Sequence, residues 1–501
     1  MSGRSEPDSH NRRAESLWEQ GREEEAIQAW EAAREIAPDS VEILVNLAWA
    51  LSRRGRFSEA LKAGRRAAEL APDEEYVRHT VGQICYGAGR YGEAITEYAA
   101  AIELQSDEAL LYCDMADALY SLERFGEAVR HYEKALALDK NDAYAELWLG
   151  RTKEQMGEDA AAAQHLHRAL KLAPEWPEAL FAVGQMCCLS GELAEAQRCL
   201  EKALESYPAE EEEGRAAAAS ELGNVHRGRG ELDRAIARYR EALALDPTHP
   251  AARFNLGLTY ADLDQYEAAI SEFDIAIEMD PEDADARVER GSAYLAQSRY
   301  DEAIEDYRAA LVLAPDHAEA YGGLGLAYYS LGVYDVSVEH YARASALAPR
   351  DPWPRYNLAL ALDAGGRHAE ADAALQEAWV LGQDDGEVCA SVARALTAQG
   401  RNPEGAVRAA RRACGLAPES ADALDALAMA LYSAGEHEAA LGPAREATRL
   451  AAEVADYWYD AGLIEEVLGK VPAARHDFER ALELAPDFEE ARDALHRLGD
   501  I

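Results

Sequence analysis

A pattern that returns every 34 residues runs through almost the whole chain of 501 residues. The sequence Leu-Ala-Pro closes segments that end at Pro72, Pro174, Pro315 and Pro486. Counting at this spacing gives fourteen units, which start near residues 7, 41, 75, 109, 143, 177, 216, 250, 284, 318, 352, 386, 421 and 455. A unit this short can bury its apolar face only against its neighbours. The chain is therefore predicted to fold as one array of stacked units, although its length alone would suit several globular domains.

Each unit has the residue pattern of two amphipathic helices. Glycine or alanine recurs near the middle of the first helix, as at Gly82 and Ala116. Glycine inside a helix costs about 0.5–1 kcal/mol relative to alanine, so its recurrence indicates that two helices approach closely. In the second helix, small residues recur seven positions apart, as at Ala94 and Ala101, which places them on one stripe. Large side chains lie between these small ones and are predicted to be core residues: Tyr98, Tyr132, Tyr239, Phe273, Tyr307, Tyr341 and Phe478.

The boundaries of the helices are marked by glycine and proline. Eleven units carry a glycine where the first helix should end, as at Gly89 and Gly332, and this residue suits a left-handed turn. Ten units carry a proline directly after the second helix, as at Pro72, and proline cannot continue a helix. The sequence therefore predicts a short turn within each unit and a sharp stop at its end.

These features resemble the tetratricopeptide repeat family over about residues 7–488. The resemblance implies an all-α fold, in which antiparallel helix pairs stack into a right-handed α-solenoid superhelix. It also implies that the first helix of each pair lines a concave groove.

Departures from the repeat suggest how the array is organised. We expect a polar N-terminal tail at residues 1–6, repeats 1–6 at 7–208, repeats 7–14 at 216–488 and a capping helix at 489–501. Residues 209–215 hold an acidic insertion with the run Glu210 to Glu213, because Pro208 and Pro247 are five residues further apart than one period. This insertion is predicted to be a possible joint. The alternative is that it only lengthens the following helix, since acidic residues favour a helix N-terminus.

Composition excludes several classes of protein. The chain has 94 acidic and 50 basic residues, a formal net charge of −44, which repels nucleic acid. No run of about 18 apolar residues is present, and the first residues lack the apolar segment of an export signal, so we expect a cytoplasmic protein without membrane insertion. The seven cysteines include no Cys-x-x-Cys pair, which argues against disulfides and zinc.

We find no arrangement of residues typical of an enzyme. His165 and His167 do not share a helix face, which argues against a metal site. The run Gly322-Gly323-Leu324-Gly325 lies within an expected helix and lacks the lysine of a phosphate-binding loop. We therefore expect no catalytic residues, no metal and no cofactor.

The predicted binding site is the concave groove that the resemblance implies. Its candidate residues are Asn46, Asp114, Asp117, Trp148, Phe181, Glu221, Phe254, Asn255, Glu289, Tyr329, Trp353, Tyr356, Asn357, Asp425, Tyr459 and Asp460. Carboxylates interspersed with aromatic rings favour a basic, partly apolar segment of a protein partner. The alternative is that the acids only keep the array in solution and the aromatics pack on neighbouring repeats.

The predicted function is a non-catalytic scaffold or adaptor that binds a protein or peptide in this groove. The alternative is an accessory or substrate-targeting subunit of a multi-protein enzyme complex, whose catalytic part is a separate chain.

Overall fold

The computed structural model describes residues 6–499, which form 29 α-helices and, within that range, no strand. Residues 1–5 of the predicted tail and the last two residues of the predicted cap lie outside this range, and Glu6 begins the first helix. The chain divides into two compact units, one that ends at Ala252 and one that begins at Arg253.

The first unit holds fourteen helices and the start of a fifteenth. They are α1 (Glu6–Glu19), α2 (Glu23–Ile36), α3 (Val41–Arg53), α4 (Phe57–Leu70), α5 (Glu75–Gly87), α6 (Tyr91–Leu104), α7 (Ala109–Tyr120), α8 (Phe125–Leu138), α9 (Ala143–Gln155), α10 (Asp159–Leu172), α11 (Pro177–Leu189), α12 (Leu193–Ser206), α13 (Glu212–Gly228), α14 (Leu232–Leu245) and α15 (Pro250–Asp262).

The second unit continues the same alternation of helix and turn. Its helices are α16 (Tyr266–Met279), α17 (Ala284–Ala296), α18 (Tyr300–Leu313), α19 (Ala318–Ser330), α20 (Tyr334–Leu347), α21 (Trp353–Ala364), α22 (His368–Gly382), α23 (Gly386–Gln399), α24 (Pro403–Leu416), α25 (Ala421–Ser433), α26 (His437–Leu450), α27 (Ala455–Val467), α28 (Val471–Leu484) and α29 (Glu489–Gly499).

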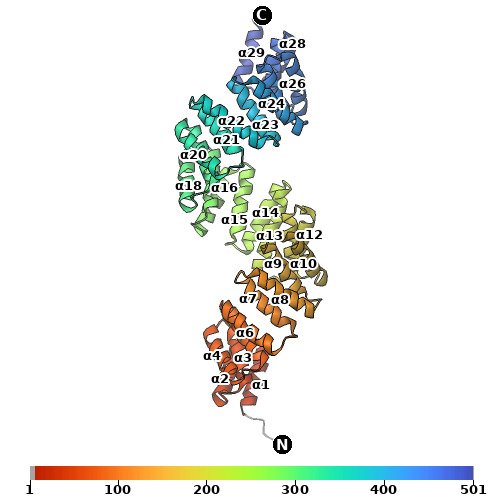
Figure 1. Cartoon of the computed structure of the whole chain (residues 1–501), viewed down its shortest axis with the longest axis vertical. Coiled ribbons are helices and arrows are strands. Elements are labelled where there is room, and N and C mark those ends of the chain that lie inside the picture. The colour runs from red at the N-terminus through yellow and green to blue at the C-terminus, as the bar shows by residue number, and fades with distance from the viewer. Residues whose placement is uncertain (1–5, 500–501) are drawn as a thin grey trace. The chain divides into compact units, whose positions relative to one another are not determined.

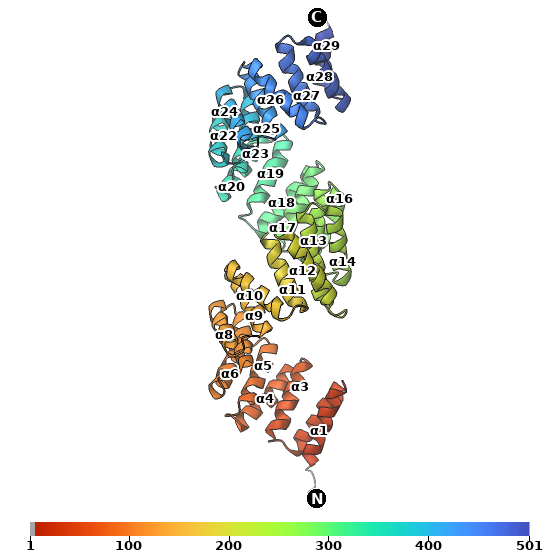
Figure 2. The same ribbon diagram turned by 90° about the vertical axis from the view of Figure 1, so that its right-hand side faces the viewer.

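Within each unit, consecutive helices pack side by side in antiparallel pairs, as Figure 1 shows for α3 with α4 and Figure 2 for α25 with α26. Odd-numbered helices also contact the next odd-numbered helix, for example α3 with α5, α5 with α7 and α23 with α25. The described even-numbered helices make no comparable contact with one another. The odd-numbered helices therefore lie on the inner face of each unit, and the even-numbered helices lie outside them.

Small residues of the odd-numbered helices face large side chains of the even-numbered ones. A Cβ atom added to Gly82 would lie 2.5 Å from the ring of Tyr98, and one added to Gly462 would lie 2.6 Å from the ring of Phe478. The seven large side chains predicted to be core residues are all buried. The close approach predicted from the recurring glycines is therefore confirmed, because the large ring occupies the space that a side chain would need.

The turn glycines have the conformation that the sequence predicts. All eleven have positive φ angles between 66° and 80°. In ten of these turns, all but the one at Gly400, the residue after the glycine donates its N–H to a carbonyl five residues earlier, as Arg90 does to Cys85 O at 2.8 Å. This hydrogen bond satisfies a carbonyl at the helix end, as in a Schellman motif. The three units without glycine place Glu123, Asp264 and Ser298 at positive φ instead.

The acidic insertion lies inside the first unit and not at the division between the units. Its last residues begin α13, which at 17 residues is the longest described helix. This arrangement corresponds to the alternative expectation of a lengthened helix, and a joint at 209–215 stays a prediction. At the other end of the chain, α29 packs on α28 and buries Leu498 beside Phe478. Across residues 6–499, no helix is both long and apolar enough to cross a membrane.

Candidate functional site on the inner faces

The sixteen candidate residues all lie on odd-numbered helices, which form the inner faces of the two units. Asp425 is buried and the other fifteen are half-buried. They do not gather into one site, since they are spread over α3, α7, α9, α11, α13, α15, α17, α19, α21, α25 and α27. Two places on these faces bring acidic candidates together, one in each unit.

In the first unit, a hollow of about 390 Å³ opens between α3, α5 and α7. We call it the inner hollow. Its lining residues are Trp49, Ser52, Arg53, Phe57, Gln83, Tyr86, Gly87, Tyr98, Asp114 and Asp117.

Two carboxylates lie at the α7 side of the inner hollow. Asp114 contacts Nε2 of His79 at 2.6 Å and accepts a hydrogen bond from Nε2 of Gln83 at 3.1 Å. Asp117 accepts hydrogen bonds from the hydroxyls of Tyr132 at 2.5 Å and Tyr144 at 2.6 Å. Burial raises the pKa of Asp117 to about 6, although both tyrosine hydrogen bonds act to lower it. These contacts hold both carboxylates in place, and among residues 6–499 neither is paired with an arginine or lysine.

Aromatic rings form the other walls of the inner hollow. Trp49 and Tyr86 are 38% and 36% exposed, so part of each ring is open to solvent. Trp49 is held by the ring of Trp18 at 4.9 Å, and Tyr86 by the ring of Tyr91 at 5.4 Å between centroids. Exposed aromatic faces beside carboxylates suit a side chain that has an apolar stem and a cationic end.

The acidic insertion borders a second, wider hollow of the first unit. Glu210, Glu211, Glu212 and Glu213 line it together with Glu178 and the candidate Phe181. The insertion therefore adds negative charge next to a predicted aromatic contact of the inner face.

In the second unit, four aspartates gather on α25 and α27, and we call them the C-terminal acidic cluster: Asp422, Asp425, Asp456 and Asp460. Arg394 of α23 forms an ion pair with Asp422. Burial, and then the neighbouring carboxylates, raise the pKa of both Asp425 and Asp460 well above the usual range.

Many of the other candidates already have internal contacts. Trp353 and Tyr356 pack against each other at 5.7 Å and against the core of the second unit. Asn46 donates hydrogen bonds to Asn11 and Glu15, each at 3.3 Å. Glu221 accepts hydrogen bonds from the side chains of Gln185 and Asn224. Four aromatic candidates contact other rings: Phe254 contacts Phe273, Tyr329 contacts Tyr334, Trp148 contacts Tyr120 and Tyr144, and Tyr459 contacts Phe478 and Phe488. Asn255, Glu289 and Asn357 lie half-buried on α15, α17 and α21.

Sequence reasoning missed the rings that line the inner hollow, Trp49 and Tyr86. A signal for them was available, because Trp49 shares position nine of its unit with the candidate Asp117, and Tyr86 shares position twelve with the candidate Tyr329. Phe57 and Tyr98 come from even-numbered helices, so no rule about the first helix of a repeat would find them.

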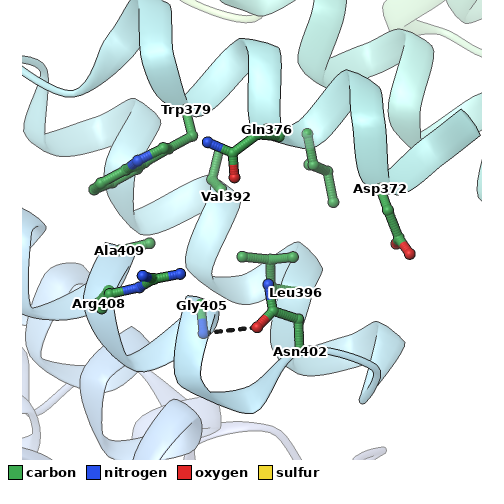
Figure 3. Close-up of a pocket in the computed structure, with 10 residues that line it drawn as sticks. Asp372, Gln376, Trp379, Val392, Leu396, Asn402, Gly405, Arg408 and Ala409 are labelled. Atoms are coloured by element: carbon green, nitrogen blue, oxygen red, sulfur yellow. Dashed lines mark hydrogen bonds between the residues drawn. The ribbon is translucent and has the colours of Figure 1, made fainter. Parts of the chain in front are cut away.

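A smaller pocket of about 100 Å³ lies between α22, α23 and α24 in the second unit, and none of the candidates lines it. In Figure 3, the ring of Trp379 and the guanidinium of Arg408 lie on one side of this pocket, and Asn402 lies across from them, where its side chain accepts the N–H of Gly405 at 2.9 Å. The pocket has room for a short side chain only. Within residues 6–499, no group of three or more His, Cys, Asp or Glu side chains could hold a metal ion.

Comparisons with known proteins identify the repeat. Family models described as "Tetratricopeptide repeat" match residues 6–73, 177–248, 220–284, 255–318, 288–352 and 426–489, and one described as "TPR repeat" matches 82–122 and 116–157. A comparison with curated proteins finds no match. Among solved structures, the chain is similar to one titled "Crystal structure of APC/C hetero-tetramer Cut9-Hcn1". The identity is 16%, the TM-score is 0.48, and the match covers 99% of this chain and 96% of that chain.

Proposed function

Because the chain belongs to the tetratricopeptide repeat family, we propose that it is a non-catalytic scaffold or adaptor that binds a basic, partly apolar segment of a protein partner on its inner faces. The observation that carries this proposal is the inner hollow, where the exposed rings of Trp49 and Tyr86 lie beside the carboxylates of Asp114 and Asp117.

The chemistry of the hollow favours a lysine or arginine side chain flanked by apolar residues. Its walls offer ring faces to an aliphatic stem and a cation, and its two carboxylates attract positive charge. Arg53 lines the same hollow, but it is exposed and is the one arginine or lysine among the lining residues. The formal charge of −44 adds long-range attraction for a basic partner, which raises the rate of encounter.

The test measures binding of a fluorescein-labelled peptide of alternating leucine and arginine by fluorescence anisotropy. A peptide of the same length with glutamate in place of arginine is the probe for charge. We expect the arginine peptide to bind and the glutamate peptide not to bind. Substituting Trp49→Ala and Tyr86→Ala together should weaken binding by about tenfold or more, since each exposed cation–π contact contributes about 0.5–1 kcal/mol in addition to lost apolar contact.

The matched control is Leu138→Ala on α8, an apolar residue of comparable exposure that does not line the hollow. Trp49 and Tyr86 are better targets than Trp353 and Tyr356, because removing the latter pair would also disturb the core. Equal binding of both peptides, or an unchanged affinity in the double variant, would contradict the proposal.

A further inference from the structure

Buried carboxylates in this molecule normally have a cation of their own. Glu146 contacts Nδ1 of His165 at 2.7 Å and Nε of Arg168 at 3.0 Å. Asp306 accepts two hydrogen bonds from Arg290, at 2.5 and 2.7 Å. Glu465 and Asp477 share Arg445, which lies 2.8 Å from Asp477. Each buried charge in this set is therefore compensated within the array, as the energetics of burial require.

Asp425 is the exception among the buried carboxylates of the described residues. Its side chain is only 8% exposed, and its buried Oδ1 has no hydrogen-bond donor. The nearby arginine, Arg394, makes its ion pair with Asp422 instead. Asp460, half-buried on the next inner helix, likewise has no ion pair within the described part of the chain. Arg394 is thus shared among four carboxylates, and the C-terminal acidic cluster keeps a net negative charge.

We propose that the C-terminal acidic cluster is a binding site for the guanidinium group of an arginine on a protein partner. This inference rests on the proposed function, because it assumes that the inner faces bind a basic segment. Asp425 and Asp460 come from neighbouring inner helices, α25 and α27, which contact each other, and Asp425 lies close enough to act on the carboxyl of Asp460.

The chemistry of the cluster selects arginine over other cations. A guanidinium has five donors in a fixed plane and is more weakly hydrated than an ammonium, so it suits buried carboxylates better than lysine does. A metal ion is a poorer fit, since no three of these side chains are placed to ligate one.

Binding of a guanidinium at this site is coupled to the release of protons from the aspartates. The charged groups around Asp425 and Asp460 are Asp422 on α25, Asp456 and the Tyr457 hydroxyl on α27, and Arg394 on α23. Burial and the surrounding carboxylates raise the pKa of both aspartates, so part of the population holds a proton near neutral pH. A guanidinium favours the ionised forms and therefore displaces protons when it binds.

The experiment compares two peptides that differ only in the end group of one side chain, which is a charged guanidinium in one peptide and a neutral ureido group in the other. One carries a single arginine flanked by leucine and alanine, and the other carries citrulline, which is neutral and nearly the same shape. Both are titrated into the full chain with Trp49→Ala and Tyr86→Ala, so that the inner hollow does not contribute. We expect the arginine peptide to bind about tenfold or more tightly, because a hydrogen bond to a charged group contributes about 1.5–3 kcal/mol.

In the chain that already carries Trp49→Ala and Tyr86→Ala, the further changes Asp425→Asn and Asp460→Asn should bring the ratio of the affinities for the arginine and citrulline peptides close to one. The control, Glu404→Gln with Glu438→Gln, makes the same change of charge at exposed positions of α24 and α26 and should leave the ratio unchanged. Calorimetry near pH 7 in two buffers of different ionisation enthalpy should detect proton release, which the Asn variant abolishes.

The outcomes separate this inference from the proposed function. If the intact chain binds neither arginine-containing peptide, the proposed function fails. If it binds them but the affinity ratio is the same with and without Asp425 and Asp460, only the inference about the C-terminal acidic cluster is wrong. Urea unfolding of each variant shows whether the fold is retained.

Discussion

At the scale of single residues, stability depends on pairs in which a small residue of an inner helix accommodates a large ring. The pairs are sixteen residues apart, as in Gly82 with Tyr98 and Gly325 with Tyr341. The size of the partner varies, since Leu166 faces Gly150 and Tyr132 lies sixteen residues after Ala116. Where the inner-helix residue is glycine, the partner occupies the space that a Cβ atom would need.

The glycines of α19 allow a direct test of this pairing. A Cβ at Gly325 would lie 2.7 Å from the ring of Tyr341, whereas a Cβ at Gly322 would meet nothing within 4 Å. We expect Gly325→Ala to lower the free energy of unfolding by about 1–3 kcal/mol because of overpacking. Gly322→Ala should raise it by about 0.5–1 kcal/mol through helix propensity. Urea denaturation followed by circular dichroism measures both, and equal effects of the two variants would refute the pairing.

The buried Asp425 predicts a stability that depends on pH. Its pKa in the folded chain lies above that in the unfolded chain, so ionisation opposes folding. This penalty is absent below the unfolded pKa, grows as the pH rises from the unfolded to the folded pKa, and is fully present above the folded pKa. Asp425→Asn removes it and should stabilise the chain by on the order of 1–3 kcal/mol at pH 8.5, but by less at pH 5.5. Thermal unfolding at both pH values checks this, and a larger gain at the lower pH would show that the sign is wrong.

At the scale of elements, each helix pair depends on a turn with one residue in the left-handed region. Glycine fills this position in eleven turns, but Glu123, Asp264 and Ser298 fill it in three. A side chain with a Cβ costs roughly 1–2 kcal/mol there, partly offset by the lower entropy of the unfolded chain. The turn therefore comes from the packing of the two helices and does not require glycine.

A reciprocal exchange tests the turns. Ser298→Gly should raise the free energy of unfolding by about 0.5–1 kcal/mol, because it relieves a residue with φ of 60°. Gly332→Ser should lower it by a similar amount, since φ at Gly332 is 74°. Denaturant midpoints measure both changes. If both substitutions destabilise the chain, the backbone conformation is not the main cause.

At the scale of the whole molecule, the charge of −44 acts on folding and on binding in opposite directions. Like charges repel within the compact chain, so salt should stabilise it, whereas salt weakens attraction to a basic peptide. Between about 50 and 500 mM NaCl we expect a higher melting temperature and a lower affinity for the arginine and leucine peptide. A neutral osmolyte at equal osmolality is the control. An affinity that rises with salt would argue against charge-driven binding.

The repeat architecture was predictable because every unit carries the same local signals. Glycine and proline mark the helix ends, and small and large residues alternate at the spacing of a helix face. Local backbone preferences and the burial of one face suffice to specify such an array. The candidate residues accordingly all lie on odd-numbered helices, while their role in binding stays a prediction.

The environment of each side chain on the inner faces, its exposure and its hydrogen-bond partners, depends on tertiary packing. The spacing places Trp353 and Trp49 on inner helices, but it does not show that the ring of Trp353 packs against the core while the ring of Trp49 borders a hollow. Nor does it show that Asp117 has two tyrosine donors while the buried Oδ1 of Asp425 has none. Side chains from two or three repeats decide these properties, so they follow from the three-dimensional neighbours of each residue and not from its position within the 34-residue period.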